Sequence, residues 1–182
     1  YRHTDYDLKS PLTDRTSDAW RILGGAIADV TNLLRIAGAV GYFSRSYDNP
    51  AFGSIGGIAL DLRADYFLSP LTTVSAIASR QVEEAVVIGS PGYVSTRVGM
   101  RVDHELLRNL VPYAFAEYAD EPFEEVDRED RRFRIGGGAD WQLNRGWSLS
   151  PTFEYVSRSS RGTQSGPNID EFRALVALRL RP

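Results

Sequence analysis

Hydrophobic and polar residues alternate along most of this chain with a period of two. In the segment 132–143, Phe133 and Trp141 fall on one parity, whereas Arg134 and Asp140 fall on the other. Successive side chains of a β-strand point to opposite faces of the sheet. The segment therefore predicts a strand with one apolar, aromatic face and one charged face.

The same alternation recurs along the chain in the segments 33–47, 58–66, 97–105, 147–155 and 172–181. It is less regular in the segments 20–31, 71–84 and 110–120. In those segments, Arg80 falls on the apolar parity, and Tyr113 and Phe115 fall in phase with Glu117. With an N-terminal strand at Tyr1–Leu8, the pattern predicts about ten strands and no helix.

The connections between these strands alternate between short and long. Short turns are expected near residues 30–33, 69–71, 108–110 and 144–146, and longer polar segments near 9–17, 48–53, 85–92, 120–130 and 161–168. Outer-membrane barrels have this rhythm, with short periplasmic turns and longer external loops. No apolar run reaches the roughly 20 residues that a membrane-spanning helix needs.

A soluble up-and-down barrel or a sandwich would also alternate, with its apolar parity inside and its charges outside. Glycine and alanine mixed with charge on the polar face, aromatic residues near strand ends and the loop asymmetry favour the membrane alternative. We therefore predict an all-β, antiparallel, up-and-down transmembrane β-barrel in the bacterial outer membrane, in contact with its lipid. Its outside surface should carry Phe133, Ile135, Trp141, Phe153, Tyr155, Val176 and Leu178.

Composition narrows the function classes. The chain has 182 residues and a formal net charge of −3, which fits one domain over residues 1–182 and argues against a nucleic-acid partner. It has no cysteine, so neither a disulfide scaffold nor a thiolate metal site is available. Lys9 is the only lysine, and arginine supplies the remaining positive charge.

Several segments resemble one known family. They are GYFSRSYDNPAFGSIGGIALDL (Gly41–Leu62), SPLTTVSAIASRQVEEA (Ser69–Ala85) and VDHELLRNLVPYAFAEY (Val102–Tyr118), continued by residues 131–136, 143–145 and 155–160. On these strand-and-turn patterns, the chain from about Trp20 onward resembles the putative β-barrel porin 2 family of outer-membrane proteins.

The resemblance implies a porin-like function and, because such proteins are often encoded near exopolysaccharide genes, polysaccharide or other envelope proteins as partners. Members of the family are generally larger. We therefore expect this chain to be the C-terminal part of a larger barrel, or to close by pairing Tyr1–Leu8 with Phe172–Leu180.

The charged parity holds the candidate functional residues. Thirteen of them would line the lumen: Asp61, Arg63, Asp65, Arg97, Arg101, Asp103, Glu105, Arg132, Arg134, Asp140, Glu154, Arg173 and Arg179. Rings of charge can select permeants by sign. Alternatively, these charges pair with one another and plug a narrow barrel. The first interpretation predicts a porin that passes anionic solutes, and the second a non-conducting docking barrel whose external loops bind a partner.

Catalytic and metal chemistry find little support in the sequence. His3 and His104 are the only histidines, and His104 falls on an apolar parity, so a serine–histidine pair is not indicated. The acidic segment Asp120–Asp130 lacks the spacing of an EF-hand, and we interpret it as solvated charge on an external loop. We expect no enzyme activity, no cofactor and no bound metal.

Overall fold

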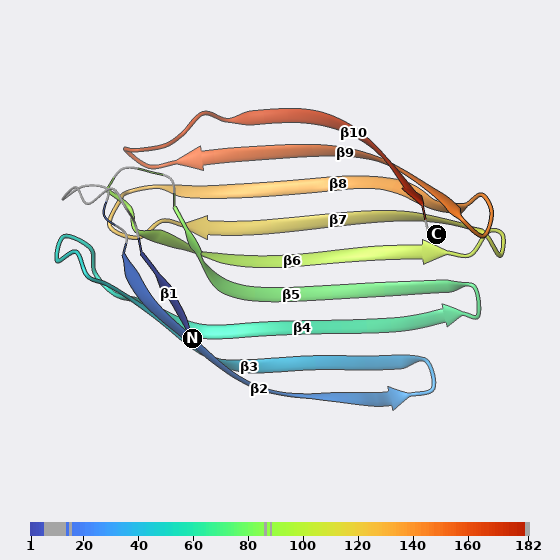
Figure 1. The fold of residues 1–182 in the computed structure, drawn as a ribbon, viewed down its shortest axis with the longest axis horizontal. Helices are drawn as coiled ribbons and strands as arrows, with labels where there is room; N and C mark the ends of the chain where they lie inside the picture. The colour runs from blue at the N-terminus through green and yellow to red at the C-terminus, as the bar shows by residue number, and fades with distance from the viewer. Residues whose placement is uncertain (6–13, 15, 86, 88, 181–182) are drawn as a thin grey trace.

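The computed structural model describes residues 1–5, 14, 16–85, 87 and 89–180. Those residues form one antiparallel sheet in which each strand pairs with its chain neighbours, in the order β1 to β10 (Figure 1). The strands are β1 (Arg2–Thr4), β2 (Ser17–Thr31), β3 (Leu34–Tyr47), β4 (Ile55–Ser69), β5 (Thr72–Glu84), β6 (Gly92–His104), β7 (Leu110–Pro122), β8 (Glu129–Gln142), β9 (Trp147–Arg161) and β10 (Ile169–Leu180). The predicted all-β, up-and-down fold is confirmed.

The predicted alternation of short and long connections is also confirmed. Short turns gather at one end of the sheet and longer loops at the other, which we call the short-turn end and the long-loop end (Figure 1). Polar side chains close the short turns: Asn144 Oδ1 accepts from the backbone N–H groups of Gly146 and Trp147 at 2.9 and 3.0 Å. The predicted strand Tyr1–Leu8 is seen as β1, and residues 6–8 lie outside the described residues.

One face of the sheet is apolar and the other is charged, as the alternation of apolar and polar residues along each strand predicts. All seven residues predicted for the outside surface lie on the apolar face; Phe153 is 63% exposed and Val176 is 69% exposed. Arg80 also lies on this face, near the long-loop end, where it donates to Thr96 Oγ1 at 3.0 Å. The described residues include no helix long and apolar enough to span a membrane.

Aromatic rings on the opposite, charged face lie over glycines of the neighbouring strand. Phe115 pairs with Gly136 and Tyr113 pairs with Gly138 across β7 and β8. A Cβ at Gly136 would lie 2.8 Å from Phe115 Cζ and 2.5 Å from the carbonyl oxygen of Phe153. Glycine is therefore needed where the ring and the β9 backbone approach closely.

The sheet curls around its charged face at the long-loop end. Arg45 and Tyr47 on that face of β3 contact Glu84 and Pro91 of the β5–β6 hairpin, skipping β4. The end of this hairpin (residues 81–85 and 89–95, the hairpin tip) lies beyond the last β4–β5 pair, Leu60 with Arg80. It buries a small apolar core against β3 and β4, made of Phe43, Ile55, Ala59 and Val94. The charged face is thus the concave one.

The sheet is open. Among the described residues, β10 pairs only with β9, and β1 covers β2 only at Ser17–Ala19. The pairing of Tyr1–Leu8 with Phe172–Leu180, expected as one route to closure, is not formed by the described residues. The rest of β2 and the outer edge of β10 present unpaired backbone groups, as in part of a barrel.

We predict that Gly136→Ala destabilises the sheet, because the added methyl group must displace both the Phe115 ring and the β9 backbone. The free energy of unfolding should fall by about 1–3 kcal/mol. Urea unfolding of the vesicle-inserted protein, followed by tryptophan fluorescence, measures it.

Gly24→Ala is the matched control, since a Cβ at Gly24 meets nothing within 4 Å. Its free energy of unfolding should change by less than about 0.5 kcal/mol. Equal losses in the two variants would contradict the ring-over-glycine account.

Candidate functional site: the charged face

The pairing register places twelve of the thirteen predicted residues on the charged face. They come from β4, β6, β8, β9 and β10, and rows of partners connect them across the sheet. One such row runs from Asp65 through Ser75, Arg101, Phe115 and Gly136 to Glu154 and Arg173. Glu105 directly follows β6, in the connection to β7.

Two of these arginines donate hydrogen bonds to a carboxylate on their own strand. Arg101 donates to both carboxylate oxygens of Asp103 at 2.7–3.0 Å. Arg63 donates to Asp65 at 2.9 Å and to Ser75 Oγ at 3.3 Å. In each pair the donor and the acceptor are two residues apart on one face. These pairs place each guanidinium beside a carboxylate that balances its charge.

Aromatic rings form part of the same face. The Arg101 guanidinium lies 3.7 Å from the ring centroid of Tyr113, and that of Arg134 lies 5.1 Å from the ring centroid of Phe115. The Tyr113 hydroxyl reaches across β8 and lies 2.6 Å from Thr152 Oγ1 on β9. Each ring therefore lies against a guanidinium group, and the contact of Tyr113 with Thr152 connects β7 to β9 across β8.

Nearer the long-loop end lie five arginines that we call the arginine cluster: Arg97, Arg132, Arg134, Arg158 and Arg173. Glu117 stands between two of them, with its carboxylate oxygens 3.5 Å from Arg97 Nε and 3.5 Å from Arg134 Nη2. Glu154 lies 3.8 Å from Arg134 and 3.6 Å from Arg173. These distances exceed those of good charge-assisted hydrogen bonds.

The cluster surrounds a cavity of about 290 Å³, which Glu117 and Glu171 also line. The Nε–H groups of Arg134 and Arg158 are buried and have no hydrogen-bond partner among the described residues. Buried donors are normally satisfied, and an unsatisfied one costs free energy. The cavity is therefore lined by guanidinium groups whose hydrogen-bonding capacity is not fully used by the described residues.

A second group of arginines lies at the short-turn end. Arg108, Arg145 and Arg179 line a cavity of about 310 Å³ together with Asp140. Asp140 accepts a hydrogen bond from Ser150 Oγ at 2.7 Å. The charged face thus carries arginine groups toward both ends, with the arginine–aromatic stacks between them.

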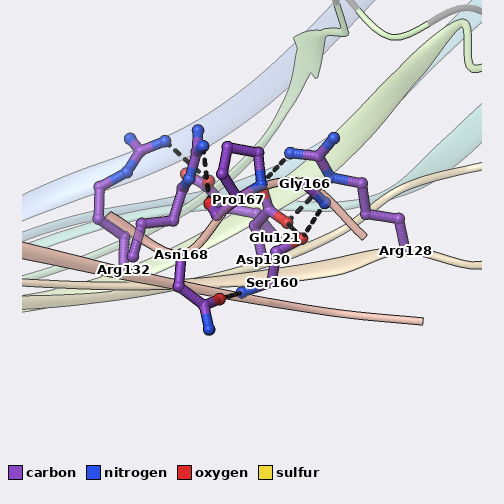
Figure 2. A network of polar contacts seen from close by, with 9 residues as sticks. Glu121, Arg128, Asp130, Arg132, Ser160, Gly166, Pro167 and Asn168 are labelled. Carbon is purple, nitrogen blue, oxygen red and sulfur yellow. Dashed lines mark hydrogen bonds and ion pairs between the residues drawn. The ribbon is translucent and has the colours of Figure 1, made fainter. Parts of the chain in front are cut away.

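At the long-loop end, a polar network connects the arginine cluster to the loops (Figure 2). Arg132 donates to Glu121 at 3.0 Å, and Arg158 donates to the carbonyl oxygen of Pro167 at 3.2 Å. Asp130 accepts from Arg128 at 2.6–2.9 Å and from Ser160. The end of β7 therefore orients Arg132, and the β9–β10 loop orients Arg158.

The same network corrects our interpretation of the acidic segment Asp120–Asp130 as solvated loop charge. β7 extends to Pro122 and β8 begins at Glu129, so only residues 123–128 form the loop. Glu121 and Asp130 are each only 2% exposed. Arginines on the same face draw these carboxylates inward, and a strand boundary cannot be read from charge alone.

Asp127, in the loop, holds the β9–β10 connection. Its carboxylate accepts from the backbone N–H of Thr163 at 2.9 Å, and its carbonyl oxygen accepts from Gln164 N–H at 3.2 Å. Hydrogen bonds from the backbone and the side chain of Thr163 lower the pKa of Asp127 below its ordinary value. The contact is therefore complete above the ordinary aspartate pKa and is lost only as the pH falls through the lowered value.

Neither histidine is arranged beside a nucleophilic serine. His104 Nδ1 lies 2.9 Å from Thr72 Oγ1 on the exposed apolar face, and His3 Nδ1 lies 2.8 Å from Asp18. Within the described ranges, no group of three or more His, Cys, Asp and Glu side chains is placed to hold a metal ion.

A sheet that exposes its apolar side chains on the convex face and gathers its charges on the concave one has the construction of a membrane-embedded β-barrel wall. The chain belongs to the family described as "Putative beta-barrel porin 2", whose model matches residues 1–182. The family resemblance inferred from the sequence is thereby confirmed, and porin membership favours a protein that is not an enzyme. No curated protein matches the chain significantly.

The predicted set lacks several residues that line the two cavities, among them Arg158 and Glu117 of the cluster cavity. Arg158 shares the parity of Glu154, so period two could have found it, had the strand been followed to Arg161. Glu117 was left undecided because Tyr113 and Phe115 share its parity. The register settles this, since all three lie on the charged face, where the rings cover glycines.

We predict that Asp127→Ala loosens the β9–β10 loop, because Thr163 loses its acceptor. Tryptic cleavage after Arg161, followed by mass spectrometry, should become about five- to tenfold faster. Glu124→Ala is the control, since Glu124 lies in the same loop with an exposed side chain. Cleavage at the same rate in both variants would show that Asp127 does not hold the loop.

Proposed function

We propose that this chain forms the wall of an outer-membrane porin whose interior favours anionic solutes. The observation that carries the proposal is the arginine cluster, in which guanidinium groups on the concave face retain unpaired donors. Family membership supports a porin, and the sign of the preference is argued from the site alone. The twelve candidate residues on the charged face would then line the lumen, and Glu105 would lie at its short-turn end.

The electrostatic reason is a difference in how arginines and carboxylates are engaged. Asp65, Asp103 and Asp140 accept hydrogen bonds at 2.6–3.0 Å from groups on the same face. Arg97 and Arg134 have only ion pairs of 3.5 Å or longer among the described residues. Positive charge is therefore more available to a passing solute than negative charge, and a pore wall selects accordingly.

The test is the reversal potential of single channels in a planar bilayer under a KCl gradient. The native protein should prefer anions, and Arg97→Ala combined with Arg101→Ala should shift the preference toward cations. The double change removes two positive charges and frees Asp103. The shift should be larger in dilute electrolyte, because screening acts over ~10 Å at 0.1 M salt.

Arg80→Ala removes the same charge from the apolar face near the long-loop end and should leave the reversal potential unchanged. A channel whose selectivity responds equally to all of these changes would contradict a selective concave face. A cation-selective native channel would contradict the proposed sign of the preference.

A second candidate function is a non-conducting docking barrel whose long loops bind an envelope partner. The hairpin tip favours it, because the tip covers the charged face of β3 at the long-loop end. Gly53 of the β3–β4 loop also lies beside the Glu125 carboxylate of the β7–β8 loop, so the loops converge there. Absence of conductance from the correctly folded, full-length protein would favour docking over the porin.

A further inference from the structure

We infer that the arginine cluster is a discrete binding site for a phosphate group, free or carried by a small solute. The inference rests on the proposed function only in placing the cluster inside a pore. It goes further in assigning a saturable site and a ligand chemistry, instead of a diffuse positive field.

The first support is that several arginine N–H groups of the cluster have no hydrogen-bond acceptor among the described residues. Arg97 and Arg134 make no hydrogen bond of ordinary length with the described residues, and Glu117 approaches both of them only to 3.5 Å. The buried Nε–H groups of Arg134 and Arg158 have no hydrogen-bond partner there either. Elsewhere on the same face, Arg63 and Arg101 bond their carboxylates at 2.7–3.0 Å. The cluster therefore brings three arginines with unused donors to one cavity, whereas Arg45, whose Nε–H is also unpaired, lies on β3.

The second support is the direction from which the donors come. Arg97 lies on β6, Arg134 on β8 and Arg158 on β9, and all three line one cavity of about 290 Å³. A planar carboxylate is satisfied by one guanidinium fork, whereas a tetrahedral phosphate offers oxygens in several directions at once. Convergent forks from three strands fit the tetrahedral group.

The third support is that neighbouring groups hold the arginines of the cavity wall in place. Arg132 and Arg158 are anchored to Glu121 and to the Pro167 carbonyl oxygen, respectively, as Figure 2 shows for the labelled side chain of Arg132. Arg173 is anchored to Glu171 at 2.8 Å. The Phe115 ring supports Arg134. Anchored arginines lose less conformational entropy when they bind a ligand, which favours a specific site.

The test is calorimetric titration of the folded, full-length protein in detergent with inorganic phosphate, at constant ionic strength set with chloride. We expect one saturable site. Arg134→Gln combined with Arg158→Gln should weaken phosphate binding at least about tenfold. Arg63→Gln, which removes the same type of charge from the same face, should change the affinity less than about threefold.

Succinate in place of phosphate separates the two oxyanion chemistries and should bind at least about tenfold more weakly. Equal affinity for both would overturn the phosphate assignment. Equal losses in the Arg63 variant and in the cluster variant, compared per charge removed, would reduce the site to a diffuse field. No saturable binding to the native protein would overturn the site itself.

If the double variant does not fold, as judged by heat-modifiable migration in SDS gels, Arg134→Lys keeps the charge and removes the fork. It should bind phosphate several-fold more weakly than the native protein, and native affinity in this variant would overturn the inference. Phosphate binding without conductance would leave the site standing and refute the porin. Conductance without saturable phosphate binding would support the porin and refute the phosphate site.

Discussion

Backbone hydrogen bonding is the constraint on which the rest of this structure depends. In hydrocarbon, each N–H and C=O must find a partner within the protein, so a sheet can span a membrane only as part of a closed barrel. From β2 to β10 each strand pairs with its chain neighbours over the body of the sheet. Among the described residues, the outer edge of β10 and that of β2 beyond Ala19 have no neighbouring strand, and β4 and β5 separate beyond Leu60 and Arg80 at the long-loop end. The antiparallel pairing also fixes the faces. Once one strand turns its aromatic residues outward, the register forces each neighbour to do the same, and the charges gather on the concave side.

On the concave side, contacts between side chains and loops add to what the alternation of apolar and polar residues determines. Phe115 and Tyr113 contact glycines of β8 and also lie against the guanidinium groups of Arg134 and Arg101, respectively. At the long-loop end, the hairpin tip lies over β3, and the loops beyond β7 and β9 are joined through Asp127. Packing, ion pairs and loop contacts thus act on the same arginines. The position of the cluster follows from four strands, β6, β8, β9 and β10, together with the β9–β10 loop that contacts Arg158.

Much of this could be predicted from the sequence, because the decisive signal is local. Period two places Phe133 and Arg134 on opposite faces without knowledge of any partner strand, and turn residues such as Asn144 mark where hairpins close. Features that depend on contacts between residues far apart in the sequence were not predicted. The burial of Glu121 depends on Arg132, eleven residues away on another strand. The hairpin tip packs against Phe43 and Ile55, which lie on other strands. The open edges of β2 and β10 agree with the predicted alternative that the chain is part of a larger barrel.

The central claim is that the apolar face meets lipid and the charged face meets the aqueous interior. Because the chain has no cysteine, single cysteines at Phe153 and Glu154, adjacent on β9, can report the two faces directly. In proteoliposomes, a bilayer-embedded quencher should quench a fluorophore at position 153 strongly and one at position 154 weakly, whereas aqueous iodide should do the opposite. The reverse pattern, with position 154 quenched from the lipid, would contradict the account and make this sheet the wall of a soluble barrel.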